Sequence, residues 1–305
     1  MGNKILAMIR DPKRIMYSLG YHGFFRYWSA EKYLKMLYHL KTSEHLDLEN
    51  PLGFNEKMQW LKLYYRNADY VQMADKYAVR QIIRERVGEK YLIPIYGVFA
   101  NSNEIDIEKL PNSFVAKTTH DSGGVFVCKD KHTIDVAKEL AVLDKRLRIN
   151  YEWYGREWYY GQFEPKIIVE KYLTDESGWE LKDYKIFCFN GEPKLIEVDY
   201  NRFVDHKLNV YDLDWNYIDF YMTSRNDSSV EIKRPENLDV MLEIARKLAA
   251  DTPFMRVDLY SIKDKIYCGE LTMCPGSGFV DFQPREWDRK LGDMLVLPEN
   301  NKKGM

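Results

Sequence analysis

Residues 254–273, which read FMRVDLYSIKDKIYCGELTM, decide the fold of this chain. Two strongly apolar runs, residues 254–260 and 265–273, flank a polar segment, and this pattern is typical of an antiparallel hairpin. Because side chains alternate along a strand, Arg256 and Asp258 share one face of the first strand, and Glu270 and Thr272 share one face of the second. If an odd-length turn such as residues 263–265 joins the strands, Asp258 lies opposite Glu270.

Carboxylates that face each other across a strand pair destabilise the sheet. A divalent cation between Asp258 and Glu270 would relieve this repulsion, and carboxylates on a rigid sheet are how magnesium is held beside nucleotide phosphates. The alternative interpretation is a salt-bridge cluster centred on Arg256.

A second strand carries charge on an otherwise apolar run. In residues 182–187, KDYKIF, the two-residue period places Asp183 and Lys185 on one face. A carboxylate and an ammonium in such a strand should pair or bind a ligand. A structural ion pair explains them about as well as a site does.

A glycine-containing loop lies between two further strand-like runs in residues 114–127, FVAKTTHDSGGVFV. Lys117 sits inside the first run, and Ser122, Gly123 and Gly124 allow backbone amides to approach an anion. The spacing matches neither a Walker loop nor a dinucleotide fingerprint, and a plain hairpin turn is the other interpretation. Residues 166–173, KIIVEKYL, form a strand whose end offers backbone groups to a nucleobase or is an ordinary strand end.

Composition bounds the class of protein. The chain has 305 residues, a formal net charge of −2, 45% hydrophobic and 30% charged residues, which excludes a disordered or fibrous protein. Without an overall basic field we expect no nucleic-acid partner. The four cysteines lie in apolar runs and suit reduced core positions in the cytosol. We therefore expect a cytoplasmic protein that is neither secreted nor membrane-spanning.

Hydrophobic periodicity predicts an α+β protein. Helices are expected at residues 30–40, 55–65, 74–87, 134–147 and 238–250, and strands at 93–99, 113–120, 124–129, 166–173, 183–189, 193–198 and 208–213, besides the final hairpin. Near the start, Ile5 to Leu19 combine apolar and basic residues at near-helical spacing. Such a helix lies on an anionic membrane, at the inner face in a cytoplasmic protein, or packs on its own protein.

In this order the segments resemble the ATP-grasp superfamily, and more closely the TupA-like ATP-grasp family. The resemblance covers about residues 50–290 and is carried by FNEKMQWLK (54–62), DKYAVR (75–80), the segments 110–124 and 183–191, and GELT (269–272). It implies an ATP-grasp fold, in which two α+β subdomains grip ATP, with a helical N-terminal region. We divide the chain into an extension (1–50), an N-terminal ATP-grasp region (51–110), a central subdomain (111–175) and a C-terminal subdomain (176–305).

The resemblance also implies roles for single residues. The phosphate side of ATP would meet Lys117 and a loop that includes His120, Ser122, Gly123 and Gly124. The adenine would lie along Glu170, Lys171, Tyr172 and Leu173, with Asp183 in the same nucleotide site. Asp258 and Glu270 would bind Mg²⁺, and Thr272 stands where many ATP-grasp enzymes have a third ligand, asparagine. Lys185 and Arg202 would stabilise the transferring phosphoryl group or the acceptor.

The implied activity is an ATP-dependent carboxylate–amine ligase that works through an acyl phosphate. Its substrates would be an amine and a carboxylated glycan, such as a capsular or teichuronic polymer in polysaccharide biosynthesis. The alternatives are a sugar or lipid-linked-sugar kinase, and a glycosyltransferase, although only Asp212-Leu213-Asp214 has the spacing of a metal motif for the latter. A non-catalytic glycan-binding module would use Trp153, Trp158 and Tyr159.

Overall fold

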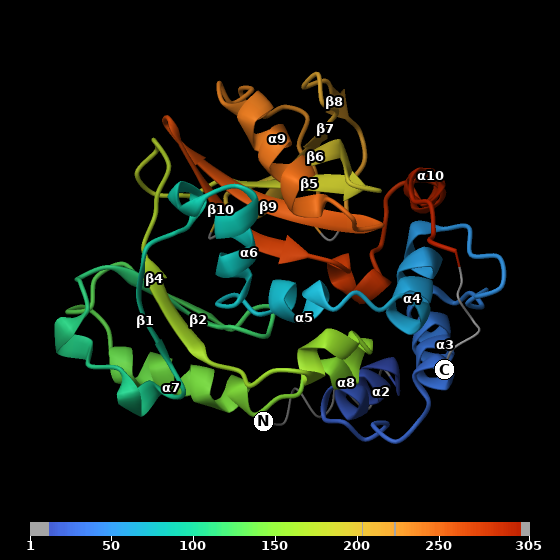
Figure 1. Ribbon diagram of the computed structural model, residues 1–305, viewed down its shortest axis with the longest axis horizontal. Helices are drawn as coiled ribbons and strands as arrows, with labels where there is room; N and C mark the ends of the chain where they lie inside the picture. The colour runs from blue at the N-terminus through green and yellow to red at the C-terminus, as the bar shows by residue number, and fades with distance from the viewer. Residues whose placement is uncertain (1–11, 203, 223, 300–305) are drawn as a thin grey trace.

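Two antiparallel sheets organise the computed structural model, which describes residues 12–299 except residues 203 and 223. In Figure 1 the larger sheet lies above the smaller one. The larger sheet consists, in spatial order, of β10 (Lys265–Thr272), β9 (Phe254–Ile262), β5 (Asp183–Phe189), β6 (Glu192–Tyr200), β7 (Lys207–Tyr211) and β8 (Tyr217–Ile218). The smaller sheet has the order β1 (Ile95–Phe99), β4 (Ile167–Lys171), β2 (Phe114–Thr118) and β3 (Val125–Cys128).

Helices surround both sheets, and the described N-terminal part is helical. The α-helices are α2 (Pro12–Tyr21), α3 (Ala30–Thr42), α4 (Phe54–Tyr64), α5 (Asp69–Ala74), α6 (Val79–Arg86), α7 (Val136–Leu147), α8 (Glu152–Gly155), α9 (Leu238–Ala249) and α10 (Glu286–Met294). The expected α+β class is confirmed. Among residues 12–299 with the two gaps, no helix is long and apolar enough to cross a membrane.

The two faces of the larger sheet differ in chemistry. One face packs against α9 through buried aliphatic side chains such as Ile186, Val198 and Val257. Part of the other face meets α4 through aromatic rings, with Phe254 5.0 Å from Phe54 and 5.2 Å from Phe189 between ring centroids. The rest of this second face carries charged side chains, and it positions the candidate site.

The register of the β9–β10 hairpin places Asp258 opposite Glu270, as expected, but by a different route. The expected odd-length turn is wrong, because Ile262 pairs with Lys265 across the two-residue turn of Lys263 and Asp264. That register alone would pair Asp258 with Gly269. A bulge between Cys268 and Glu270 shifts the pairing by one residue and brings the two carboxylates face to face.

The single helix expected over residues 74–87 is wrong as well. The chain forms α5 and α6 instead, and the break lies at Asp75, whose carboxylate accepts hydrogen bonds from the backbone N–H of Tyr77 (2.8 Å) and of Ala78 (3.4 Å). An aspartate that bonds the backbone two residues ahead competes with helix continuation.

The expected basic helix over Ile5 to Leu19 is described only in part. Residues 5–11 lie outside the described residues, and residues 12–19 belong to α2. This helix contacts α8, and the Tyr17 hydroxyl donates to the carbonyl of Leu40 at 3.3 Å. The described part therefore packs on the protein, while Lys13, Arg14 and Ile15 are exposed.

Candidate functional site

A cleft of about 570 Å³ lies between the smaller sheet and the charged face of the larger sheet. Side chains of β2 and β4 line one side, those of β5, β9 and β10 line the other, and residues 172–181 connect the two. The predicted site residues that line it are Lys117, Ser122, Gly123, Glu170, Lys171, Tyr172, Leu173, Asp183, Lys185, Arg202, Asp258 and Glu270. Folding thus gathers residues that lie up to 153 positions apart in the sequence.

Three predicted residues do not line the cleft. His120 is buried, its Nε2 lies 3.0 Å from the carbonyl oxygen of Ile149, and burial lowers its pKa. Gly124 is held by its own loop, since its N–H donates to the Asp121 carboxylate at 3.2 Å. The Thr272 hydroxyl accepts a hydrogen bond from Arg256 at 3.1 Å.

The glycine-containing loop is both a hairpin connection and a wall of the cleft. β2 and β3 pair antiparallel up to Lys117 and Val125, so the loop joins two ladder partners. The buried Asp121 carboxylate fixes its shape by accepting hydrogen bonds from the Thr118 hydroxyl and, at 2.5 Å, from Arg146. The loop is therefore preorganised, with Ser122 and Gly123 at the cleft.

Lys117 reaches the cleft as half of an ion pair. Its Nζ lies 2.7 Å from Oε2 of Glu170 on the neighbouring strand β4, and both side chains are largely buried. A ligand phosphate placed here would compete with the Glu170 carboxylate for the ammonium group. The ion pair with Glu170 holds the Lys117 ammonium group at the place where the phosphate side of a nucleotide is expected.

A second lysine, Lys76, reaches the same loop although the sequence argument gave it no role. The break between α5 and α6 turns Lys76 inward, where its backbone N–H donates to the Thr119 carbonyl at 3.0 Å. Its Nζ donates to the Asp121 carbonyl at 2.6 Å and lies 3.5 Å from Oε1 of Glu270. The only signal in the sequence was that Lys76 lies in one of the segments that carry the family resemblance.

On the larger sheet, Lys185 lies at the centre of a row of charged side chains. In the strand register it is opposite Glu197 on β6 and Asp258 on β9, and its Nζ pairs with Glu197 at 3.1 Å and with Asp199. Burial alone would lower the pKa of Lys185, but Glu197 and the neighbouring carboxylates raise it above its usual value. For Lys185 the ion-pair interpretation therefore holds, because its ammonium group is paired with carboxylates of the neighbouring strand.

Glu197 and Asp199 were missed by the sequence argument. They alternate along the apolar run LIEVDY, which is the same signal that singled out Asp183 and Lys185. Arg202, which follows this strand, lies 3.2 Å from Asp183 and its side chain is 44% exposed, so its guanidinium group is accessible from the cleft.

Besides Arg202 and Asp183, a second arginine–carboxylate pair lies on the charged face. Arg256 donates two hydrogen bonds to the Asp258 carboxylate, of 2.7 Å from Nε and 2.6 Å from a terminal nitrogen. This is the salt-bridge arrangement that the sequence left open as the alternative to a metal. Among the described residues, no group of three or more His, Cys, Asp or Glu side chains is arranged to hold a metal ion.

The carboxylates of this face nevertheless fit a divalent cation in charge and in donor type. Oδ1 of Asp183 is buried and has no hydrogen-bond partner among the described residues. Burial, and next the charge of Asp258, raises the pKa of Asp183 to about 7. Burial alone would raise the pKa of Glu270, but the positive charges of Lys76, Arg256 and Lys117 together hold this pKa below its usual range. Oxygen donors that repel one another in a rigid sheet are suitable Mg²⁺ ligands.

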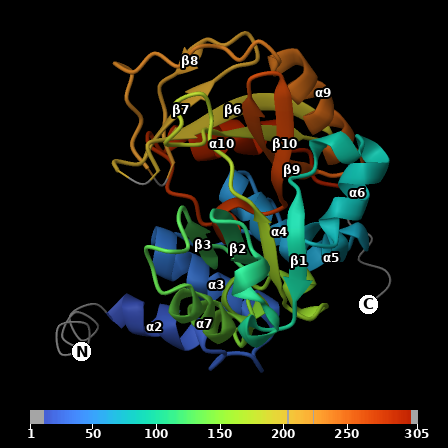
Figure 2. The ribbon, with the colours of Figure 1, turned by 90° about the vertical axis from the view of Figure 1, so that its left-hand side faces the viewer.

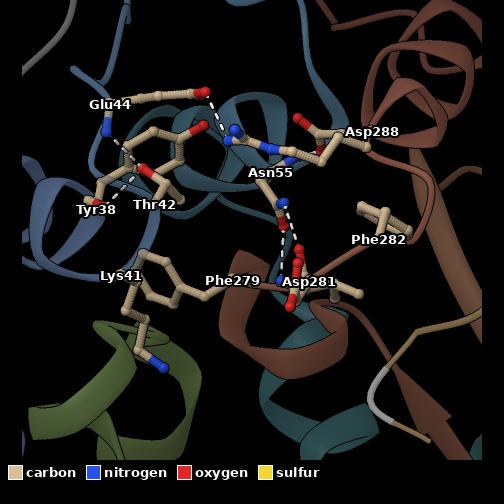
Figure 3. A pocket seen from close by; sticks show the side chains of 11 residues that line it. Tyr38, Lys41, Thr42, Glu44, Asn55, Phe279, Asp281, Phe282 and Asp288 are labelled. Atoms are coloured by element: carbon tan, nitrogen blue, oxygen red, sulfur yellow. Dashed lines mark hydrogen bonds and ion pairs between the residues drawn. The ribbon is translucent and has the colours of Figure 1, made fainter. Parts of the chain in front are cut away.

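A smaller hollow of about 240 Å³ lies between α3, the start of α4 and α10, and none of the predicted site residues lines it (Figure 3). Several of its polar groups are engaged with one another or with the backbone. The Asn55 amide bonds the backbone of Val280 at 2.8 and 2.9 Å, and the Asp288 carboxylate accepts from the N–H of Asn55 at 2.9 Å. Arg285 lies 2.6 Å from Glu44. These contacts join α4 and α10 to the loop at Val280 and to the segment that follows α3.

Several solved structures with similar folds are ligases or synthetases by their titles. An L-amino acid ligase from Bacillus licheniformis is 13% identical with a TM-score of 0.47, and the match covers 73% of this chain and 49% of that one. D-alanine-D-alanine ligase from Helicobacter pylori is 16% identical with a TM-score of 0.42, covering 80% and 69%. N5-carboxyaminoimidazole synthetase from Staphylococcus aureus, complexed with ADP, is 13% identical with a TM-score of 0.44, covering 89% and 59%. This chain thus spans about half the length of the first of these proteins.

No curated protein matches the chain. The family comparison is decisive, because the sequence model of the TupA-like ATP-grasp family matches residues 56–296, which is most of the chain and includes both sheets. The chain therefore belongs to the TupA-like ATP-grasp family, and its fold is the ATP-grasp fold.

Proposed function

We propose that the protein is an ATP- and Mg²⁺-dependent carboxylate–amine ligase that acts on a carboxylated cell-surface polysaccharide. The observation that carries this proposal is the cleft, which is lined by the cations Lys76 and Lys117 and by the carboxylates Asp183, Asp258 and Glu270. Cations and metal-binding carboxylates that converge on one cleft suit a bound triphosphate. The membership of the chain in an ATP-grasp family supports the same nucleotide.

On the phosphate side, Lys117 and Lys76 would bind phosphate oxygens, and the backbone at Ser122 and Gly123 would contact them. Asp258 and Glu270 would hold Mg²⁺, with Thr272 beside them, and the ion would neutralise charge on the phosphates. Each oxygen of the Asp258 carboxylate accepts one hydrogen bond from Arg256 and keeps a further lone pair that could meet the metal. The adenine would lie along residues 170–173, which border the cleft.

The reaction needs no nucleophilic side chain. A carboxylate oxygen of the substrate attacks the terminal phosphorus of ATP, and ADP leaves with the electron pair of the broken bond. The amine then attacks the carbonyl carbon of the acyl phosphate, inorganic phosphate leaves, and the amine loses a proton. Arg202 would hold the substrate carboxylate, because it is partly exposed at the cleft and, among the described residues, its ion-pair partner is Asp183 alone. Lys185 would act through the field of its buried ammonium group.

The acceptor and the alternatives rest on the family resemblance and on the chemistry of the site. A carboxylated capsular or teichuronic polymer fits the family, and a sugar or lipid-linked-sugar kinase would use the same ATP site. The glycosyltransferase alternative loses its only candidate motif, because the Asp212 carboxylate accepts hydrogen bonds from the backbone of Asp214 and Asn216 and so fixes its own turn. Of the candidate glycan-stacking rings, Tyr159 is buried in the core.

The fate of the phosphoryl group tests this proposal. With a carboxylated glycan as substrate, we expect ADP and free phosphate as products, and a hydroxamate when hydroxylamine replaces the amine. A stable phosphorylated sugar would instead identify a kinase, and consumption of a nucleotide sugar without ATP would identify a glycosyltransferase.

Arg202→Gln should lower turnover more than it lowers affinity for ATP, because the guanidinium group serves the acceptor. Arg246→Gln is the matched control, since Arg246 is also about half exposed and pairs with one carboxylate, Glu192, at 2.9 Å, but lies on α9. Equal turnover in the two variants would remove Arg202 from the site.

A further inference from the structure

The loop between α2 and α3 presents three aromatic side chains to solvent. Phe24 is 66% exposed, Tyr27 is 85% exposed and Trp28 is 38% exposed. We call residues 24–28 the aromatic loop. Large exposed rings gathered in one short segment are unusual on a protein surface and mark an interaction site.

The exposure of these rings is imposed by the fold. Phe25, the second residue of the loop, is buried, and its ring packs edge-on against Trp28 with centroids 4.9 Å apart. The buried Arg156 donates a hydrogen bond to the Phe25 carbonyl, and the N–H of Trp28 donates to the same carbonyl at 2.9 Å. Gly23 adopts a φ of +74° against the Trp153 ring, where a Cβ would clash. The loop is therefore anchored with Phe24 and Tyr27 facing outward.

The sequence on either side of the aromatic loop is basic. Residues 12–35 contain five lysines and arginines and one acidic residue, Glu31, although the whole chain has a net charge of −2. Two of these cations lie on the rings themselves, because Arg26 stands 4.5 Å from the Tyr27 ring and Lys32 stands 4.4 Å from the Trp28 ring. Exposed aromatic rings with cations beside them match the boundary between lipid headgroups and acyl chains.

We propose that the aromatic loop, together with Arg26 and Lys32, docks the protein on the surface of an anionic phospholipid membrane. Basic side chains near such a surface are attracted to it, and Phe, Tyr and Trp insert at headgroup level. A second copy of the chain is a poorer occupant, since a two-fold contact would place the same basic surface against itself. α2 lies at the lower edge of the molecule in both ribbon views (Figures 1 and 2), so docking there leaves the larger sheet and α9 turned away from the membrane.

This site differs from the basic helix expected near the start of the chain, because its residues follow α2. It concerns where the protein sits and does not depend on the proposed reaction. A membrane location would place the enzyme where lipid-linked polymers are built, but vesicle binding can succeed or fail whatever the substrate is.

The test is co-sedimentation of the full chain with vesicles of phosphatidylglycerol and phosphatidylcholine, and with vesicles of phosphatidylcholine alone. We expect binding to the anionic vesicles that weakens as salt is added. Arg26→Gln with Lys32→Gln should weaken binding about 30-fold at low salt, the value for two lost charges of about 1 kcal/mol each. Lys194→Gln with Lys233→Gln is the matched control, because both lysines are exposed elsewhere on the molecule.

The apolar part is tested by Phe24→Ser with Tyr27→Ser, which should weaken binding at least about tenfold. Its control is Leu52→Ser with Tyr96→Ser, which removes two exposed apolar side chains from other surfaces. All variants should keep the unfolding temperature and the ATP affinity of the unaltered protein, so a failure of the nucleotide site is seen separately.

Three results would overturn the inference. One is an intact protein that does not sediment with anionic vesicles, and another is vesicle binding that both test pairs leave unchanged, which would assign binding to another part of the protein. The third is a loss of self-association, measured by analytical ultracentrifugation, in place of a loss of lipid binding, because it would identify a second copy of the chain as the occupant.

Discussion

Replacing Lys185 by methionine should destabilise the whole protein, because this lysine neutralises carboxylates inside the larger sheet. Its side chain is 11% exposed, and those of Glu197 and Asp199 are 6% and 1% exposed. Methionine preserves the unbranched stem and removes only the ammonium group. Asp199 would retain His206, at 3.2 Å, but that imidazole is 37% exposed and compensates little.

The expected magnitude follows from the burial of the partners. Removing one member of a buried ion pair costs about 3–5 kcal/mol, because the other charge is left without compensation. Arg202→Gln removes a cation whose side chain is 44% exposed, and a pair of that kind contributes about 1 kcal/mol or less. The two candidate catalytic cations should therefore differ in their effect on stability by at least about 2 kcal/mol.

Urea unfolding, followed by tryptophan fluorescence and by circular dichroism, measures this difference. The triple variant Lys185→Met, Glu197→Gln, Asp199→Asn should recover at least half of the lost stability, since it also removes the carboxylates that need the lysine. If Lys185→Met unfolds within about 1 kcal/mol of the unaltered protein, the ammonium group does not stabilise the sheet and the reasoning is refuted. Activity lost by Lys185 variants must accordingly be measured only under conditions where the variant is folded.

Three further predictions concern the same cleft. In the folded protein the pKa of Asp183 is about 7, above the ordinary 3.8, so the folded state binds this proton more tightly than the unfolded state does. The free energy of unfolding should therefore fall as the pH rises from about 4 to about 7, and Asp183→Asn should remove this pH dependence, as unfolding at both ends of that range will show. Lys117→Met should weaken ATP binding about tenfold to a hundredfold by calorimetry with Mg²⁺, because it removes a charge-assisted contact, whereas Lys129→Met should not; equal affinities would leave Lys117 a structural residue. Glu270→Gln should lower Mg²⁺-dependent ATP consumption about a hundredfold, because it removes a proposed metal ligand. The free energy of unfolding should stay within about 1 kcal/mol, since the side chain is 38% exposed and its pair with Lys76 is 3.5 Å long. Near-normal consumption at every Mg²⁺ concentration would contradict the metal assignment.

Much of the fold could be predicted because strand and helix periods are local properties. The expected strand at 183–189 agrees with β5, and the helices at 30–40 and 238–250 agree with α3 and α9 within two residues. The alternation of Asp183 and Lys185, and of Arg256 and Asp258, assigned these charges to one face of their strands, and the structure has them there. The segments that resemble the TupA-like ATP-grasp family identified the family, which the comparison confirms.

Other features depended on contacts that periodicity does not encode. Asp258 faces Glu270 because of a bulge, and the expected turn length would have given the same pairing for a different reason. The break at Asp75 depends on a hydrogen bond of its side chain, and it places Lys76 against Asp121, which lies 45 residues further along the chain. Neither effect is visible in a hydrophobic pattern.

The sequence by itself determined which residue types lie on the charged face and which family the chain belongs to, because side-chain alternation and motif order are written along the chain. Only the tertiary structure decided which charges neutralise which: Lys185 with Glu197 and Asp199, and Lys117 with Glu170. It also decided that the aromatic loop faces solvent while Phe25 is buried. The physical reason is that partner choice and exposure depend on distances between segments far apart in sequence, and these are fixed only when the sheets and helices pack together.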